Sequence, residues 1–149
     1  MKNAVPRSTS LAALALVALG ATGCKGKVEQ CNAFIERANQ AQTSIGAMKF
    51  ESEESAQLEA DAMKIDGEAK AIEGVKLKDD KLLGFQKSYA KNLGDLAKNV
   101  RDLAKLHAAL KAGKTDVEAQ AKKLESDADK VGKDSDKLID EINKYCTGQ

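Results

Sequence analysis

The sequence predicts an all-α fold, an antiparallel up-down four-helix bundle, and three observations predict it. The chain contains one proline, Pro6, and is rich in Ala, Lys, Leu and Glu, so helices are permitted along almost its whole length. Apolar residues recur at alternating intervals of three and four, and the strict alternation typical of strands is missing. Glycines and capping residues divide this pattern into four stretches. We therefore expect four helices that pack through apolar stripes.

The first 23 residues differ in composition from the remainder of the chain. This segment begins with the basic residues Lys2 and Arg7, continues with the apolar run Leu11 to Leu19 and ends in small residues. Nine helical residues rise only about 14 Å, which is too short to cross a hydrocarbon core that needs about 20 residues. This pattern is typical of an export signal that ends just before Cys24.

The tetrapeptide Ala21-Thr22-Gly23-Cys24 resembles the lipobox at the end of a bacterial prolipoprotein signal. The small residues and the cysteine match this motif, whereas Ala21 stands where such motifs usually carry Leu or a similar aliphatic. The resemblance implies cleavage before Cys24 and a lipid on its thiol. Lys25 follows instead of the Asp associated with inner-membrane retention, so the resemblance favours the outer membrane. The alternative is ordinary secretory cleavage at the same bond, which leaves Cys24 unmodified.

These features divide the chain into four parts. Residues 1–23 are expected to be the signal peptide and 24–27 a tether to the lipid. Residues 28–146 are expected to form the helical domain, and 147–149 a short C-terminal tail.

The first two helices are expected near residues 27–48 and 53–73. The break between them lies between Gly46 and Ser52-Glu53-Glu54 and is the weakest, because no proline enforces it. Several stripe positions are alanines, so the helices should approach closely around a thin core. The two stripes are Val28, Cys31, Ile35, Ala38, Gln42 and Ile45, and then Leu58, Ala62, Ile65, Ala69 and Ile72.

The third and fourth helices are expected near 79–112 and 116–146 and have longer stripes. Gly74 ends the preceding helix, and Asp79 is the predicted N-cap of the third. Gly113 predicts that the third helix ends at a glycine in the left-handed conformation, and Thr115 to Glu118 fits the S/T-x-x-E capping box at the start of a fourth helix. The stripes are Leu82, Gln86, Tyr89, Leu93, Leu96, Val100, Leu103, His107 and Leu110, and then Val117, Ala121, Leu124, Ala128, Val131, Ser135, Leu138, Ile142 and Tyr145.

Three cysteines constrain the topology. Lipidation of Cys24 leaves Cys31 and Cys146, which lie beyond an export signal and are expected to form a disulfide. The alternative is two free thiols. A disulfide needs Cα atoms within about 7 Å, and the first and last ends of an up-down bundle meet only when the number of helices is even. The expected pairing therefore supports the weak break near residue 50.

Composition and motifs exclude several classes of function. The chain has 24 Lys and Arg against 23 Asp and Glu, so no excess of basic charge predicts nucleic-acid binding. With one histidine and no hydrolase or di-iron motif, we predict neither catalysis nor a metal or other cofactor. The resulting hypothesis is a non-enzymatic, lipid-anchored protein of the bacterial envelope that acts as a structural or protein-interaction module. The alternative is a helical bundle that binds or carries a small ligand.

The unequal helix lengths predict an interaction surface. The third and fourth helices should extend as a hairpin beyond the four-helix body, away from the membrane. A section with only two helices leaves more apolar surface open, and such surfaces are often contact sites. We expect a protein partner or a second copy to bind between residues 103 and 124. The candidate residues are Leu103, Leu106, His107, Leu110, Val117 and Leu124.

Overall fold

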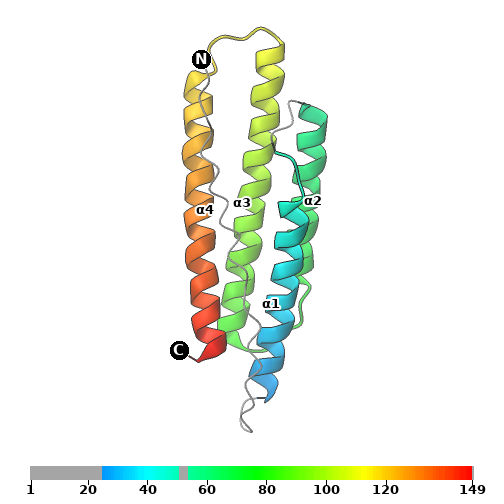
Figure 1. The fold of residues 1–149 in the computed structure, drawn as a ribbon, viewed down its shortest axis with the longest axis vertical. Helices are drawn as coiled ribbons and strands as arrows, with labels where there is room; N and C mark the ends of the chain where they lie inside the picture. The colour runs from blue at the N-terminus through cyan, green and yellow to red at the C-terminus, as the bar shows by residue number, and fades with distance from the viewer. Residues whose placement is uncertain (1–24, 51–53, 149) are drawn as a thin grey trace.

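The structure, a computed structural model, describes residues 25–50 and 54–148. These residues form four helices, and no strand occurs in the two described ranges. The helices are α1 (Lys25–Gly46), α2 (Ser55–Glu73), α3 (Asp80–Lys111) and α4 (Glu118–Thr147), with their long axes roughly side by side (Figure 1). The all-α prediction is confirmed, and every helix begins and ends within two residues of its expected position.

Local chemistry explains most of the helix ends. The Asp79 carboxylate accepts a hydrogen bond from the Leu82 amide at 2.9 Å and so caps α3, as predicted. Gly74 follows the last residue of α2, and its amide donates to the Lys70 carbonyl. Gly113 has a φ of 75°, the left-handed conformation that glycine adopts without a steric penalty.

The prediction of a capping box at Thr115 is wrong. The N-cap of α4 is Val117, which makes no side-chain cap hydrogen bond, and the helix begins at Glu118. Residues 114–117 have no regular structure and connect the end of α3 to the start of α4. The chain needs these residues to cross between the two helix axes, so the helical conformation starts after the box rather than inside it.

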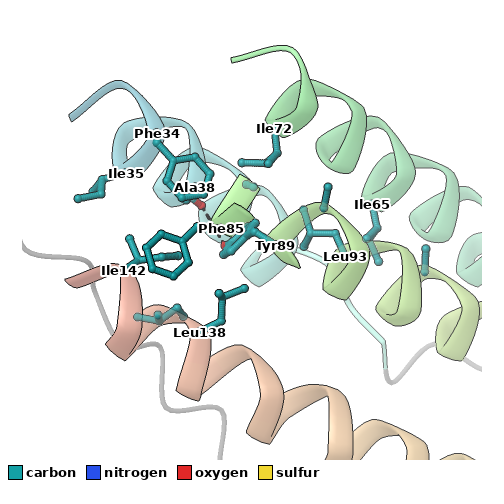
Figure 2. Close-up of a cluster of buried hydrophobic side chains, with 14 of the residues drawn as sticks. Phe34, Ile35, Ala38, Ile65, Ile72, Phe85, Tyr89, Leu93, Leu138 and Ile142 are labelled. Atoms are coloured by element: carbon teal, nitrogen blue, oxygen red, sulfur yellow. Dashed lines mark hydrogen bonds between the residues drawn. The ribbon is translucent and has the colours of Figure 1, made fainter. Parts of the chain in front are cut away.

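The main core lies where all four helices meet. Figure 2 shows side chains from the four helices pointing toward one another, with Phe85 and Tyr89 of α3 in the middle. Tyr89 packs edge-on against Phe34 at a centroid distance of 6.2 Å, and its hydroxyl donates to the Ala38 carbonyl at 3.4 Å. Burial raises the pKa of Tyr89 to about 12. Buried alanines such as Ala97 agree with the close helix approach expected from the sequence.

Polar contacts at both ends show how α2 runs relative to α3. Glu54, at the start of α2, pairs with Lys111 at the end of α3 at 3.7 Å. At the other end, the buried Gln86 amide donates to the carbonyls of Ile72 and Val75 at 2.8 Å each. These two helices are therefore antiparallel, and the polar stripe position at Gln86 satisfies carbonyls at the end of α2.

The other helices bury the two ends of α4 to different extents. Its buried side chains are Leu138, Ile139 and Ile142, all in its last third. Among the described residues α4 packs along α3 and touches α1, but it has no packing contact with α2. The predicted stripe is therefore only partly covered in its first part: Ala128 is exposed, and the other stripe residues before Leu138 are half-buried. A stripe with one neighbouring helix is only partly shielded from water.

Candidate interaction surfaces

The two ends of the molecule differ in how tightly their elements are joined. The disulfide end comprises the first two turns of α1, the turn 74–79 between α2 and α3, and the last turn of α4. Cys31 and Cys146 are joined there by a disulfide, with their Cα atoms 5.8 Å apart and 115 positions apart in the sequence. The predicted pairing is present in the structure. Cys24 lies outside the described residues.

A polar network reinforces the disulfide end. The Tyr145 hydroxyl donates to the Asp79 carboxylate, with oxygen distances of 2.8 and 2.9 Å. The bond from the Leu82 amide, followed by the bond from Tyr145, lowers the pKa of Asp79, and the same contact raises the pKa of Tyr145. The Lys27 ammonium lies 3.7 Å from the centre of the Tyr145 ring.

α1 joins this network through a side chain that sequence reasoning missed. The side-chain Oε1 of Gln30 accepts hydrogen bonds from the backbone amides of Lys78 and Asp79, the second at 3.0 Å. The bond ties α1 to the turn between α2 and α3. No local pattern could have revealed it, because 48 positions separate Gln30 from Lys78.

The hairpin end comprises the last part of α3, residues 112–117 and the first part of α4, and it holds the six residues predicted to bind a partner. Figure 1 shows that α1 ends well below the upper ends of α3 and α4. Leu110 is 51% exposed, whereas Leu106 is only 8% exposed. A partner at this end would meet Leu110 rather than Leu106. The remaining candidates are half-buried: Leu103, His107, Val117 and Leu124.

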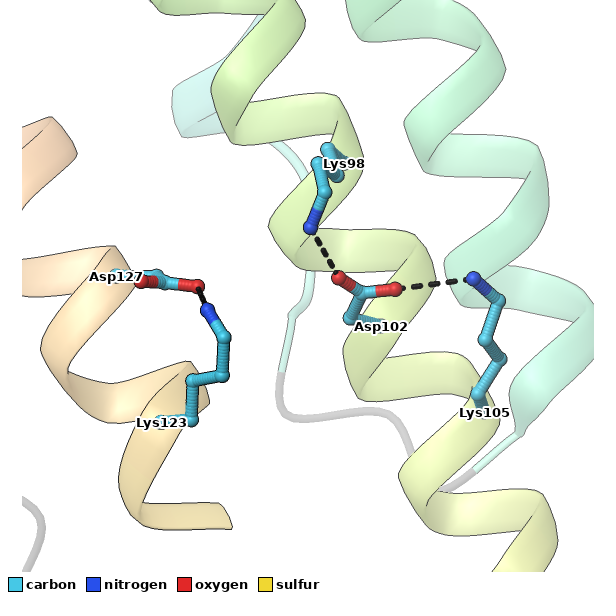
Figure 3. Close-up of polar contacts among 5 residues, drawn as sticks. All are labelled: Lys98, Asp102, Lys105, Lys123 and Asp127. Atoms are coloured by element: carbon cyan, nitrogen blue, oxygen red, sulfur yellow. Dashed lines mark hydrogen bonds and ion pairs between the residues drawn. The ribbon is translucent and has the colours of Figure 1, made fainter. Parts of the chain in front are cut away.

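Charged side chains flank the apolar positions of the hairpin. On α3 the Asp102 carboxylate accepts from Lys98 at 2.7 Å and from Lys105 at 3.0 Å, and on α4 Lys123 pairs with Asp127 (Figure 3). Hydrogen bonds from the two lysines lower the pKa of Asp102. The hydrogen bond to Asp102 raises the pKa of Lys98, and the nearby Asp127 charge adds to this increase across the hairpin. Each of these ion pairs lies within one helix, so they stabilise α3 and α4 individually rather than joining the two helices.

The chemistry available elsewhere is limited. Within residues 25–50 and 54–148, no group of three or more His, Cys, Asp or Glu side chains is arranged to hold a metal ion. A depression of about 550 Å³ lies on α4 between Lys122 and Asp134, and the described residues that line it all belong to that helix. None of the helices described is long and apolar enough to cross a membrane.

Comparisons of the chain with protein-family models, with curated proteins and with solved structures find no match.

Proposed function

We propose that this protein is a non-enzymatic, lipid-anchored module of the bacterial cell envelope that acts through protein contacts or as a structural element. In this proposal the mature chain begins at Cys24 and carries lipid there, on the periplasmic face or the cell surface, with the outer membrane favoured. The observation that supports it best is the disulfide between Cys31 and Cys146. Disulfides persist in oxidising compartments outside the cytoplasm, and this pairing leaves Cys24 as the single remaining cysteine.

The proposed architecture is an antiparallel up-down bundle with a projecting hairpin of α3 and α4. Two contacts support the up-down order: the antiparallel pairing of α2 with α3, and the disulfide between the start of α1 and the end of α4. The hairpin extends well beyond α1 (Figure 1), whereas the Glu54–Lys111 ion pair brings the start of α2 close to the end of α3. In this arrangement the hairpin end lies opposite the proposed lipid. Its exposed Leu110 is then available to a protein partner or to a second copy.

The intact mass of the protein isolated from membranes tests the anchor. We expect a mass that corresponds to residues 24–149 plus acyl chains, and two hydrogens fewer than the dithiol form. After a high-salt wash, which screens electrostatic contacts, Cys24→Ser should be recovered in the soluble envelope fraction. A mass without lipid, or a variant that stays bound to membranes after this wash, would contradict the anchor. A small molecule retained under native but not denaturing conditions would favour the alternative, a ligand-binding bundle.

A matched pair of variants tests the hairpin end. Leu110→Glu should reduce self-association or partner cross-linking, because it places a charge on the exposed apolar position. Met63→Glu is the control, because Met63 is 63% exposed on α2, away from the hairpin. Light scattering and cross-linking in intact cells provide the measurement. Equal effects of the two substitutions would contradict a specific role for the hairpin.

A further inference from the structure

Four exposed lysines gather at the disulfide end. Lys76 and Lys78 lie in the turn between α2 and α3, Lys81 in the first turn of α3, and Lys144 in the last turn of α4. None of them forms an ion pair with a described residue, and Lys81 instead lies 4.9 Å from the centre of the Phe85 ring. In contrast, many lysines along α3 and α4 have carboxylate partners within 4.0 Å: Lys91, Lys98, Lys105, Lys111, Lys122, Lys123 and Lys137.

The carboxylates at this end offset the lysines only in part. The Asp79 carboxylate accepts hydrogen bonds from the Tyr145 hydroxyl and the Leu82 amide. Glu29, Glu73 and Asp80 are exposed and form no ion pair with a described residue, and Asp79 keeps its charge. Residues 25–31, 73–81 and 143–148 together carry six lysines against four carboxylates. The lysine ammonium groups are thus free to pair with anions from outside the chain.

The elements that carry these lysines are held together. The disulfide joins α4 to α1, the Gln30 side chain joins α1 to the backbone of Lys78, and Tyr145 joins α4 to Asp79. The backbone positions that carry Lys76, Lys78, Lys81 and Lys144 are therefore held at one end of the molecule.

This surface lies near the proposed anchor. α1 begins at Lys25, directly after Cys24, so residues 25–27 of the expected tether are helical. At 1.5 Å per residue, Cys31 lies about 9 Å along α1 from Lys25. This length is close to the Debye length of about 8 Å at physiological ionic strength, so charges at the disulfide end lie within range of a charged membrane surface.

We infer that the disulfide end binds the phosphate headgroups of anionic phospholipids through Lys76, Lys78, Lys81 and Lys144. The inference rests on the proposed anchor at Cys24 and adds a second, electrostatic contact with the same membrane. One lipid attachment alone leaves a protein free to rotate about it, whereas a basic surface beside the attachment orients the long axis. The hairpin end is then held away from the membrane.

Vesicle sedimentation of residues 24–149 carrying Cys24→Ser tests this inference without a lipid on the protein. This chain contains all four helices and both paired cysteines. We expect it to bind vesicles that contain phosphatidylglycerol, to bind vesicles of pure phosphatidylcholine much less, and to dissociate as salt is raised. Substitution of the four lysines by Gln should weaken binding to the anionic vesicles on the order of a thousandfold.

The control removes the same charge elsewhere. Lys87, Lys114, Lys130 and Lys133 are exposed and form no ion pair with a described residue, and their substitution by Gln should change binding little. Circular dichroism and the intact disulfide show that each variant is folded. Equal binding to both kinds of vesicle, or equal losses in both quadruple variants, would overturn the inference. A native protein without lipid would instead contradict the proposed anchor, and the vesicle result remains separate from it.

Discussion

Removal of the disulfide should destabilise the protein strongly. The bond closes a loop across 115 sequence positions. In the chain-entropy model, a loop of this length contributes about 4–5 kcal/mol by constraining the unfolded state. Because α4 buries only Leu138, Ile139 and Ile142, few other side chains hold it to the body. We expect Cys31→Ala with Cys146→Ala to lower the free energy of unfolding by about 4 kcal/mol.

Urea and thermal unfolding, followed by circular dichroism, measure this loss. It should lower the melting temperature by about 10–20 °C. Reduction of the wild type should reproduce the effect, and reduction of the double variant should change nothing. A loss below about 1 kcal/mol would refute the entropic reasoning. If the double variant is destabilised but the reduced wild type is not, the loss comes from the packing of the buried Cys31 rather than from the cross-link.

Three further predictions concern single positions. Gly113→Ala should lower the free energy of unfolding by about 1 kcal/mol, because the φ of Gly113 is 75°. The control Gly132→Ala lies inside α4 with open space at the Cβ position and should raise this free energy by up to about 1 kcal/mol. Urea unfolding measures both, and effects of the same sign would contradict the conformational argument. Gln86→Leu should cost about 1–3 kcal/mol because it removes the donor to buried carbonyls near the end of α2, and an unchanged urea midpoint would show that water replaces it. Because the folded-state pKa of Asp79 is lowered, its carboxylate stabilises the fold above the unfolded-state pKa of about 3.9, and this contribution is lost as the pH falls through the folded-state value. Asp79→Asn should therefore be less stable than the wild type at pH 7 and equally stable at strongly acidic pH, whereas Asp80→Asn serves as the neighbouring control.

The sequence was sufficient for the features that depend on near neighbours in the chain. Helix propensity, glycine breaks and the Asp79 cap act within a few residues, and they located all four helices to within two residues. The cysteine pairing was also predictable, because the expected export signal and the expected lipidation of Cys24 left one pair. Of the six candidate interface residues, the sequence placed all on one hairpin, but it did not separate exposed Leu110 from buried Leu106.

Tertiary structure alone decided how much of each stripe is covered and which distant polar groups meet. The stripe of α4 has the same period as that of α3, yet its first part is only half-buried because α4 has α3 as its main neighbour. The bond between Asp79 and Tyr145 joins residues 66 positions apart, and the bond between Gln30 and Asp79 joins residues 49 apart. A periodic pattern records which face of a helix is apolar, but burial and pairing depend on what the rest of the chain places against that face.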